Sequence, residues 1–378
     1  MTKWKYKISA LLLLLLFGSG IVRANSLSKK QLIKEIHQSF DVDSDAILGV
    51  HNRYGNIKIT TWNKNTVDVD VLIKVKTASK SKGQTFLEDI SIDFSHSRSK
   101  VGMKTVYPDQ ENSSWWSSWW SNSNNIDFEV HYTIKVPKGI STNLVNKYGS
   151  ISQASIGGSS DVTNKFGDIF FDNVGGNLTL NLGYGKANVS KVKNVIVEIK
   201  NSTLTIATCD DIKMTSKYSN FSFGSCGNMD LDTKYDEFTI ESAREIVNNG
   251  KYDNFKIGEA ESLILETKNT SVSVKKLNRK CKVKTKYGSI HVRSTGPNLE
   301  LISLESKYTE YKFGVDSDFH LKFLGDYSGL SIGVSHEKYH SEKDGSEINV
   351  KAFRGTKNAK LKISADLKYG GLKITENK

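Results

Sequence analysis

Lys147-Tyr-Gly-Ser-Ile151 is a short motif that returns, with variations, along most of the 378-residue chain. Its second position is aromatic or Asn and falls at Tyr148, Phe166, Tyr184, Asn201, Tyr218, Tyr235, Tyr252, Asn269, Tyr287, Tyr308 and Tyr327, with further copies at Tyr54 and Tyr369. From Tyr148 to Tyr327, successive copies lie 17 to 21 residues apart. This period is too short for two-helix repeats or propeller blades and is typical of one coil of a β-solenoid.

Aligning the repeats on this position gives columns of apolar residues. Three residues later stand Ile151, Ile169, Ala187, Leu204, Phe221, Phe238, Phe255, Val272 and Ile290, and five residues later stand Phe171, Val189, Ile206, Phe223, Ile240, Ile257, Val274 and Val292. Because side chains of a strand alternate between its two faces, both columns belong to one buried face. Eight residues later comes a column of often small residues, which Gly, Asn and Asp surround as at a corner.

The columns predict an all-β fold, a right-handed parallel β-solenoid (β-helix) of about a dozen coils of 17–21 residues. Each coil has two short strands and two corners, and every strand pairs with its equivalent about 4.8 Å along the axis. The right hand follows from the general rule for crossovers between parallel strands.

Residues 25–145 and 146–378 differ in pattern. The first segment holds one coil around Tyr54 and then alternating strands at 67–75, 90–94, 101–107 and 128–136, which predicts an antiparallel β insertion that caps the N-terminal end. The second segment holds the solenoid repeats, a larger loop at 334–346, and closing strands at 347–353 and 361–372.

Residues 1–24 have the features of a secretory signal peptide. A basic segment, Met1–Lys7, precedes an apolar run, Ile8–Val22, and cleavage is expected after Ala24. The alternative is an uncleaved anchor, but the apolar run is shorter than the roughly 20 residues that span a bilayer. We therefore expect a protein that is exported to the periplasm, the outer surface or the medium.

Composition excludes several classes of protein. The 53 Lys and Arg against 41 Asp and Glu give a net charge of +12, too modest for a polybasic nucleic-acid-binding tail as the main theme. Only 3 Pro argue against a disordered chain, and 3 Cys exclude a disulfide-dense scaffold.

The order of these motifs resembles the bacterial putative-adhesin family, whose members carry a β-strand-repeat domain of unknown function. The resemblance lies in the segments 53–59 (Arg-Tyr-Gly-Asn-Ile-Lys-Ile), 67–71 and 130–137 (Val-His-Tyr-Thr-Ile-Lys-Val-Pro), in the Tyr-Gly-Ser-Ile repeats, and in Gly355, 361–363 and 369–372. It implies an exported β-solenoid at the cell envelope, and it brings no catalytic residues with it. The Trp-rich segment described next departs from the family pattern.

Residues 113–125 form the most unusual local segment, Ser-Ser-Trp-Trp-Ser-Ser-Trp-Trp-Ser-Asn-Ser-Asn-Asn. Trp115, Trp116, Trp119 and Trp120 cannot all be buried at a strand or helix period. Exposed Trp side chains mark contact surfaces, so this loop is the first candidate binding site for a glycan, a membrane or a protein partner. The alternative is that the loop folds back and covers the end of the solenoid.

A second candidate is a basic edge, because Lys precedes the aromatic position in most repeats. This weaker candidate consists of Lys147, Lys165, Lys217, Lys234, Lys251, Lys286 and Lys307. Stacked about 5 Å apart, these ammonium groups would attract a linear polyanion. We favour the alternative that the row is solvated and offset by acids at the same corner, namely Asp168, Asp236, Glu237, Asp253 and Glu310.

Two further patterns carry weaker signals. His336-Glu-Lys-Tyr-His340 matches a zinc-protease string, but its flanks lack a helical period, so no metal is expected and the pair stays a weak loop candidate. Cys209 and Cys226 lie 17 residues apart in the corner column, where stacked Cα atoms about 5 Å apart allow a disulfide. We favour the interpretation of both as small inward residues, because side chains that point the same way strain a bridge. Cys281 is expected to be a buried free thiol.

We therefore expect an exported, non-enzymatic, adhesin-like binding protein of the bacterial cell envelope or surface, with no cofactor. Its expected partners are a cell-surface glycan, a membrane surface or an envelope protein, and not nucleic acid. Two alternatives stay open: a structural or accessory envelope protein without a ligand, and a polysaccharide lyase on a β-helix. The tight, regular corners disfavour the lyase, which needs a groove between long loops.

Overall fold

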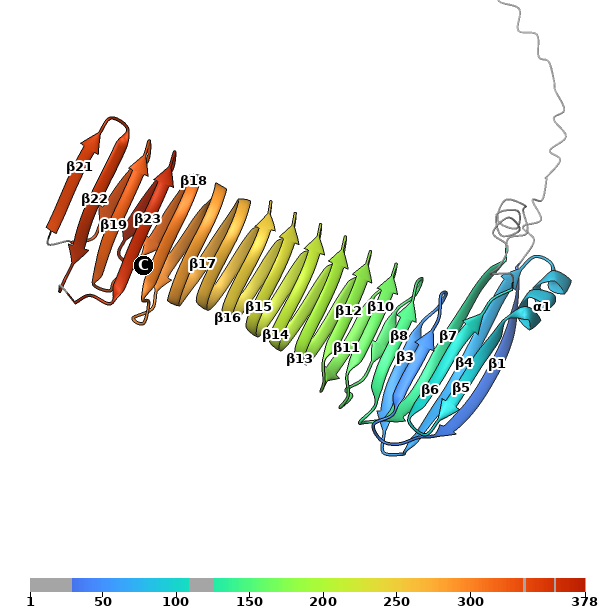
Figure 1. The fold of residues 1–378 in the computed structure, drawn as a ribbon. Helices are drawn as coiled ribbons and strands as arrows, with labels where there is room; N and C mark the ends of the chain where they lie inside the picture. The colour runs from blue at the N-terminus through green and yellow to red at the C-terminus, as the bar shows by residue number, and fades with distance from the viewer. Residues whose placement is uncertain (1–28, 109–125, 336–337, 357, 378) are drawn as a thin grey trace, which may run out of the picture.

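A computed structural model describes residues 29–108, 126–335, 338–356 and 358–377. Within these residues the protein is all-β apart from one helix, and its 24 strands belong to one continuous sheet. The sheet winds along a rod, with the early strands at one end and the last strands at the other (Figure 1).

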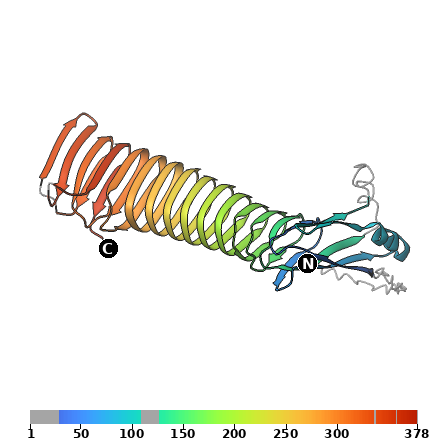
Figure 2. The same cartoon turned by 60° about the horizontal axis from the view of Figure 1, so that its bottom comes forward.

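The middle of the rod consists of coils whose strands pair in parallel and in register. The strands are β13 (Lys186–Lys200), β14 (Thr203–Lys217), β15 (Asn220–Lys234), β16 (Glu237–Lys251), β17 (Asn254–Thr295) and β18 (Leu301–Gly314). From β13 to β17 the paired residues of neighbouring coils lie 17 positions apart, as Cys209 and Cys226 do and Phe221 and Phe238. Figure 2 shows these coils stacked along the rod. The predicted repeat is thus present in the structure.

Shorter strands form the preceding coils. These are β8 (Ser141–Asn146), β9 (Ile151–Gln153), β10 (Ser160–Lys165), β11 (Ile169–Val174) and β12 (Leu178–Gly183). On one face β8, β10, β12 and β13 pair in parallel, and on the other β9, β11 and β13 do the same. Each coil therefore contributes to two faces that meet at two corners.

The N-terminal end is an antiparallel cap, as the sequence predicts. It contains β1 (Lys30–Asp41), β2 (Ile47–His51), β3 (Ile57–Trp62), β4 (Thr66–Thr77), β5 (Ser91–Ser97), β6 (Lys100–Val106) and β7 (Asp127–Pro137). Antiparallel pairs β1–β4, β4–β7 and β5–β6 join the coils through the parallel pairs β7–β3–β9 and β6–β2–β8. The complete sheet is therefore mixed, and the prediction of a parallel fold applies to its coils alone.

One element of the cap was not predicted. The helix α1 (Lys80–Asp89) lies against β4 and β1 and buries Gly83, Phe86 and Leu87. These three residues recur at helical spacing within an otherwise polar segment, so one narrow apolar stripe drives its packing.

The C-terminal end departs from the order of the sequence. Its strands are β19 (Phe319–Asp326), β20 (Gly329–Gly333), β21 (Lys338–Asp344), β22 (Glu347–Arg354), β23 (Leu361–Lys368) and β24 (Gly371–Thr375). The last coil, β23–β24, inserts between β18 and the earlier coil β19–β20. Strands β22 and β21 then extend β19 antiparallel, so part of the expected loop at 334–346 is a strand.

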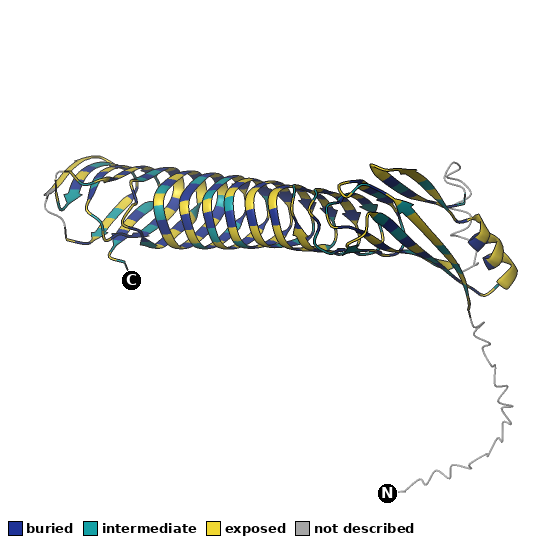
Figure 3. Ribbon diagram, turned by 90° about the horizontal axis from the view of Figure 1, so that it is seen from below, coloured by how far each residue is buried: buried dark blue, intermediate teal, exposed yellow. Residues whose placement is uncertain are grey.

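The core consists of the inward columns that the repeats predict. Buried and exposed residues alternate along each strand, which Figure 3 shows as bands on the coils. Phe238 lies between Phe221 and Phe255, with ring centroids 4.7 and 4.4 Å apart. In-register stacking places identical residues face to face, so each coil covers the apolar surface of the next.

Candidate functional site: an aromatic and lysine edge

One corner of the rod turns through the aromatic or Asn position of every repeat. From Phe166 to Tyr369, eleven residues at this position have φ between 47° and 63°. This left-handed conformation is uncommon for residues other than Gly, although Asn adopts it more readily. The corner therefore points each ring outward, away from the core between the two faces.

The outward rings stack on one another in register and form a row that we call the aromatic ladder. Stacked neighbours have ring centroids 4.8 to 5.3 Å apart and nearly parallel planes. Its members, in spatial order, are Tyr54, Tyr148, Phe166, Tyr184, Tyr218, Tyr235, Tyr252, Tyr287, Tyr308, Tyr369 and Tyr327. The inserted last coil places Tyr369 between Tyr308 and Tyr327, an order that the sequence does not reveal.

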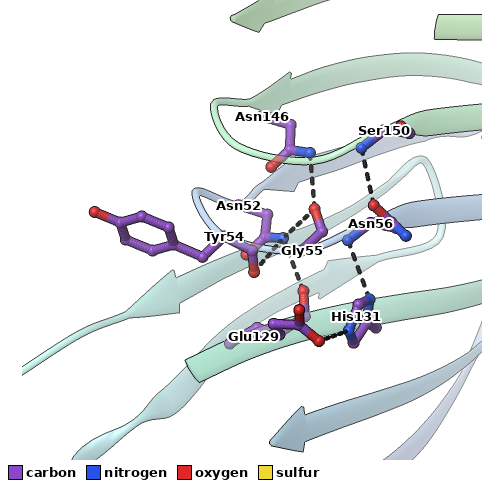
Figure 4. A network of polar contacts seen from close by, with 9 residues as sticks. Asn52, Tyr54, Gly55, Asn56, Glu129, His131, Asn146 and Ser150 are labelled. Atoms are coloured by element: carbon purple, nitrogen blue, oxygen red, sulfur yellow. Dashed lines mark hydrogen bonds and ion pairs between the residues drawn. The ribbon is translucent and has the colours of Figure 1, made fainter. Parts of the chain in front are cut away.

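Buried amides support the first turns of the ladder from inside. The Asn52 Nδ2 donates to the carbonyl of Val130 at 2.9 Å, and the Asn146 Nδ2 donates to that of Gly55 at 2.9 Å (Figure 4). The backbone N–H of Ser150 donates to the Asn56 side chain at 2.9 Å. At the corner the backbone carbonyl and N–H groups lose their hydrogen-bond partners in the sheet. These side chains replace those partners, since buried polar groups are normally hydrogen-bonded.

In the middle coils two buried carboxyl groups take over this role. Asp236 accepts hydrogen bonds from the Ser219 N–H and the Ser216 hydroxyl, both at 2.7 Å. Asp253 accepts from the Asp236 N–H at 3.0 Å and from the Thr233 hydroxyl at 2.8 Å. Burial raises the pKa of both carboxyl groups, that of Asp253 to about 6, because it disfavours the charged form.

Asp253 should make stability depend on pH. Its pKa rises from 3.8 in an unperturbed carboxyl to about 6, so between these values the folded protein holds more protons than the unfolded chain. The contribution of Asp253 to the free energy of unfolding therefore falls as pH rises through this window and levels off above it. We expect the Asp253→Asn variant to lose most of this fall, as measured by melting temperatures from about pH 3 to about pH 7, roughly one unit beyond each end of the window. An identical pH profile for the variant and the wild type would contradict the assignment.

Lysine side chains lie beside the ladder in most of the coils. The pairings place Lys200, Lys217, Lys234, Lys251 and Lys268 directly beside one another in successive coils. The same column also contains Lys165, Lys286, Lys307 and Lys368. Lys147 holds the equivalent place before Tyr148 in the preceding coil. The column is interrupted at two positions, which are Gly183 and Asp326. The Nζ atoms of Lys147, Lys165, Lys234 and Lys286 lie 5.0 to 5.1 Å from the centroid of the adjacent ring, within cation–π range.

The acids at this corner differ from the expected arrangement. Asp236 and Asp253 are buried beneath the turn, where they hold backbone and hydroxyl groups instead of facing the lysines. Within the described residues, Lys368 is the one lysine of this column that forms an ion pair, with Asp326 at 2.8 Å. The column is therefore less compensated by ion pairs than its sequence suggests.

The two corner cysteines are joined in the structure. Cys209 and Cys226 form a disulfide between adjacent coils, with Cα atoms 4.7 Å apart, and Cys281 is a buried free thiol. Burial raises the pKa of the Cys281 thiol to about 12. We expect thiol titration of the unfolded, unreduced protein to count one free thiol, and a count of three would contradict the bridge.

Several other candidates lie wholly or partly outside the described residues. Residues 1–28, the Trp loop with Trp115, Trp116, Trp119 and Trp120, and His336 are outside them. His340 lies on the exposed strand β21, where its Nε2 is 3.0 Å from Glu342. Among the described residues, no helix is long and apolar enough to cross a membrane.

The structure also groups three residues that the sequence analysis did not single out. The Nδ1 of His37 is 2.8 Å from Asp70, and its Nε2 is 3.8 Å from Asp68. The pairing of β1 with β4 brings them together, a long-range contact that no local motif announces. Lys135 lies 3.8 Å from the same Asp68 and compensates part of its charge.

Comparisons with known proteins give distant likenesses. No protein-family model and no curated protein matches the chain. Solved structures that align with it include a putative cell adhesion protein from Clostridium sporogenes, at 8% identity over 92% of this chain and 100% of that chain, with a TM-score of 0.19. A putative adhesin from Bacteroides fragilis aligns at 11% identity over 90% and 97%, with a TM-score of 0.19. A putative lipid binding protein from Parabacteroides distasonis aligns at 10% identity over 92% and 97%, with a TM-score of 0.23.

Two of these three neighbours are thus described as a putative cell adhesion protein and a putative adhesin. Identities of 8 to 11% and TM-scores of 0.19 to 0.23 assign no function to this chain. Membership of the family that the sequence resembles stays a prediction.

Proposed function

We propose that this protein is an exported, non-enzymatic, adhesin-like binding protein of the bacterial cell envelope or surface. In this proposal the coils form a right-handed β-solenoid, the signal peptide is removed after Ala24, and the rod contacts a glycan, a membrane or a protein partner. The observation that carries the proposal is the edge at which a row of exposed aromatic rings runs beside a row of lysines.

The stacked lysines of this edge repel one another, and an anionic ligand would remove that repulsion. Two ammonium groups about 5 Å apart repel by about 0.8 kcal/mol in water before screening by salt. The Coulomb cost recurs between neighbouring coils, because the pairings stack Lys200 through Lys268 without interruption. An anionic polymer lying along the rod would neutralise it, whereas the cation–π contacts of some of these lysines leave the repulsion between neighbouring coils in place.

The Trp loop is the second contact surface in this proposal. It connects the end of β6 to the start of β7, and both strand ends belong to the N-terminal cap. A rod that binds through its cap and along one edge presents two distinct surfaces to a cell envelope.

Replacing Trp115, Trp116, Trp119 and Trp120 together with Ser should abolish or strongly weaken attachment to glycans, vesicles or cells. The melting temperature should stay unchanged, because the coils have their own core of Val, Ile, Leu and Phe. Attachment and melting temperature are to be measured on the same variant. The matched control replaces Ser113, Ser114, Ser117 and Ser118 with Ala.

A large fall in melting temperature with unchanged attachment would contradict this proposal. Each buried large aromatic residue contributes about 3–5 kcal/mol, so a structural cap would be destabilised strongly. That result would favour a structural role for the loop.

A further inference from the structure

Within a continuous stretch of the aromatic ladder, each ring covers the faces of its neighbours and leaves its edge to solvent. Such rings cannot stack on a ligand. At the start, Tyr54 is covered by Phe128, at 4.9 Å between ring centroids. Ring faces are uncovered where a neighbour is missing, which occurs at Asn201 and Asn269 and beyond the last ring, Tyr327.

The two internal breaks differ in how open they are. At Asn201 the flanking rings Tyr184 and Tyr218 are 50% and 52% exposed. At Asn269 the flanking residues Tyr252 and Tyr287 are 45% and 39% exposed, and the Lys286 ammonium lies 5.0 Å from the centroid of the Tyr287 ring. The column position before Tyr184 is Gly183, which has no side chain to cover that ring. The break at Asn201 is therefore the more accessible one.

The dimensions of the break suit one inserted ring. Tyr184 and Tyr218 belong to coils two strand spacings apart, or about 9.6 Å. A ring midway between them would lie about 4.8 Å from each, and stacked rings of the ladder are 4.8 to 5.3 Å apart. Asn201 is shorter than Tyr, so its amide ends beneath the outer part of the two rings.

The charges and side chains around the break indicate which class of ligand it can bind. Lys200 and Lys217 flank the break, both exposed, and neither has an ion pair within the described part of the chain. The acid closest along the strand is Glu198, which is also exposed. The two tyrosine rings can pack against the C–H faces of a pyranose, and the Asn201 amide can hydrogen-bond its hydroxyl groups. The lysine ammonium groups can pair with a carboxylate on the sugar. A chair-shaped sugar is also thicker than a flat aromatic ring, which fits the wide spacing of the walls.

We propose that the break at Asn201 binds a carboxylate-bearing pyranose ring of an acidic polysaccharide. Tyr184 and Tyr218 stack on its two faces, the Asn201 amide hydrogen-bonds its hydroxyl groups, and Lys200 and Lys217 pair with its carboxylate. This inference rests on the proposed binding function and names the ligand class and a site separate from the Trp loop.

The test replaces Asn201 with Tyr, the residue that occupies this position in most other coils. Asn201 has φ of 50° and Tyr218 has φ of 55°, so the Asn201→Tyr variant keeps the backbone and completes the ladder. Its melting temperature should equal or exceed that of the wild type. The matched control is Asn269→Tyr, which fills the second break. The probe is a tetrasaccharide of galacturonic acid, with a neutral glucose tetrasaccharide for comparison, in isothermal titration calorimetry.

We expect Asn201→Tyr to weaken tetragalacturonate binding at least about tenfold, since two aromatic contacts of about 1 kcal/mol each are lost. Asn269→Tyr should retain the wild-type affinity. Lys200→Gln should weaken binding of the acidic probe and leave that of the neutral probe unchanged. Unchanged binding by Asn201→Tyr, loss of binding by Asn269→Tyr alone, or no binding of the acidic probe by the wild type would each overturn the inference.

The Trp variant separates this inference from the proposed function. If Asn201→Tyr binds glycans like the wild type while the four-Trp variant does not, the binding function stands and this site does not. If the wild type attaches to no glycan, vesicle or cell, the proposed function itself fails.

Discussion

The variant Phe238→Ala should lower the free energy of unfolding by about 3–5 kcal/mol. Phe238 is fully buried and its ring lies between those of Phe221 and Phe255. The truncation removes contacts with both neighbouring coils, and the regular sheet around the cavity leaves little freedom for collapse.

Urea unfolding monitored by circular dichroism would measure this loss. The control is Thr239→Ala, an exposed residue of the same strand, which should change stability by less than about 0.5 kcal/mol. A loss below about 1 kcal/mol for Phe238→Ala would show that the coils are not held together by the stacked core.

The variant Gly167→Ala should cost about 2–3 kcal/mol, the upper part of the usual range for a point substitution. A Cβ atom at Gly167 would overlap the carbonyl oxygen of Gly149 in the previous coil. That oxygen is backbone and cannot move without disturbing the strand pairing on both sides. This overlap explains why Gly follows the aromatic residue in the early repeats.

Ser202 provides the control for Gly167, because it occupies the same position in a later coil and has a side chain there. Ser202→Ala loses two hydrogen bonds, one that the hydroxyl donates to the Lys200 carbonyl and one that it accepts from the Gly185 N–H, and should cost about 1–2 kcal/mol. Equal melting temperatures for Gly167→Ala and the wild type would contradict the steric account.

The repeat columns could be read from the sequence because in-register stacking places equivalent residues of successive coils side by side. The same chemistry then recurs at the same offset, as in Phe221, Phe238 and Phe255. The helix α1 escaped prediction because Phe86 and Leu87 form a stripe only about two residues wide in a polar segment. The insertion of β23–β24 escaped it because chain order and spatial order differ there.

The sequence predicts one part of the candidate edge, and the structure alone shows the other. The Lys and Tyr columns follow from the repeat, whereas the inward turn of Asp236 and Asp253 depends on hydrogen bonds from the neighbouring coil. The sequence shows Asn201 and Asn269 as equivalent breaks. The difference between them arises from Gly183 in one case and from the position of the Lys286 ammonium in the other.

A glycan array probed with folded residues 25–378 tests most directly the proposal that the rod binds an acidic glycan at the Asn201 break. We expect selective binding to glycans that contain carboxylate-bearing pyranoses, weakened by salt because the lysine column contributes charge. Absence of binding to every glycan by a protein whose circular dichroism is strand-dominated would contradict it.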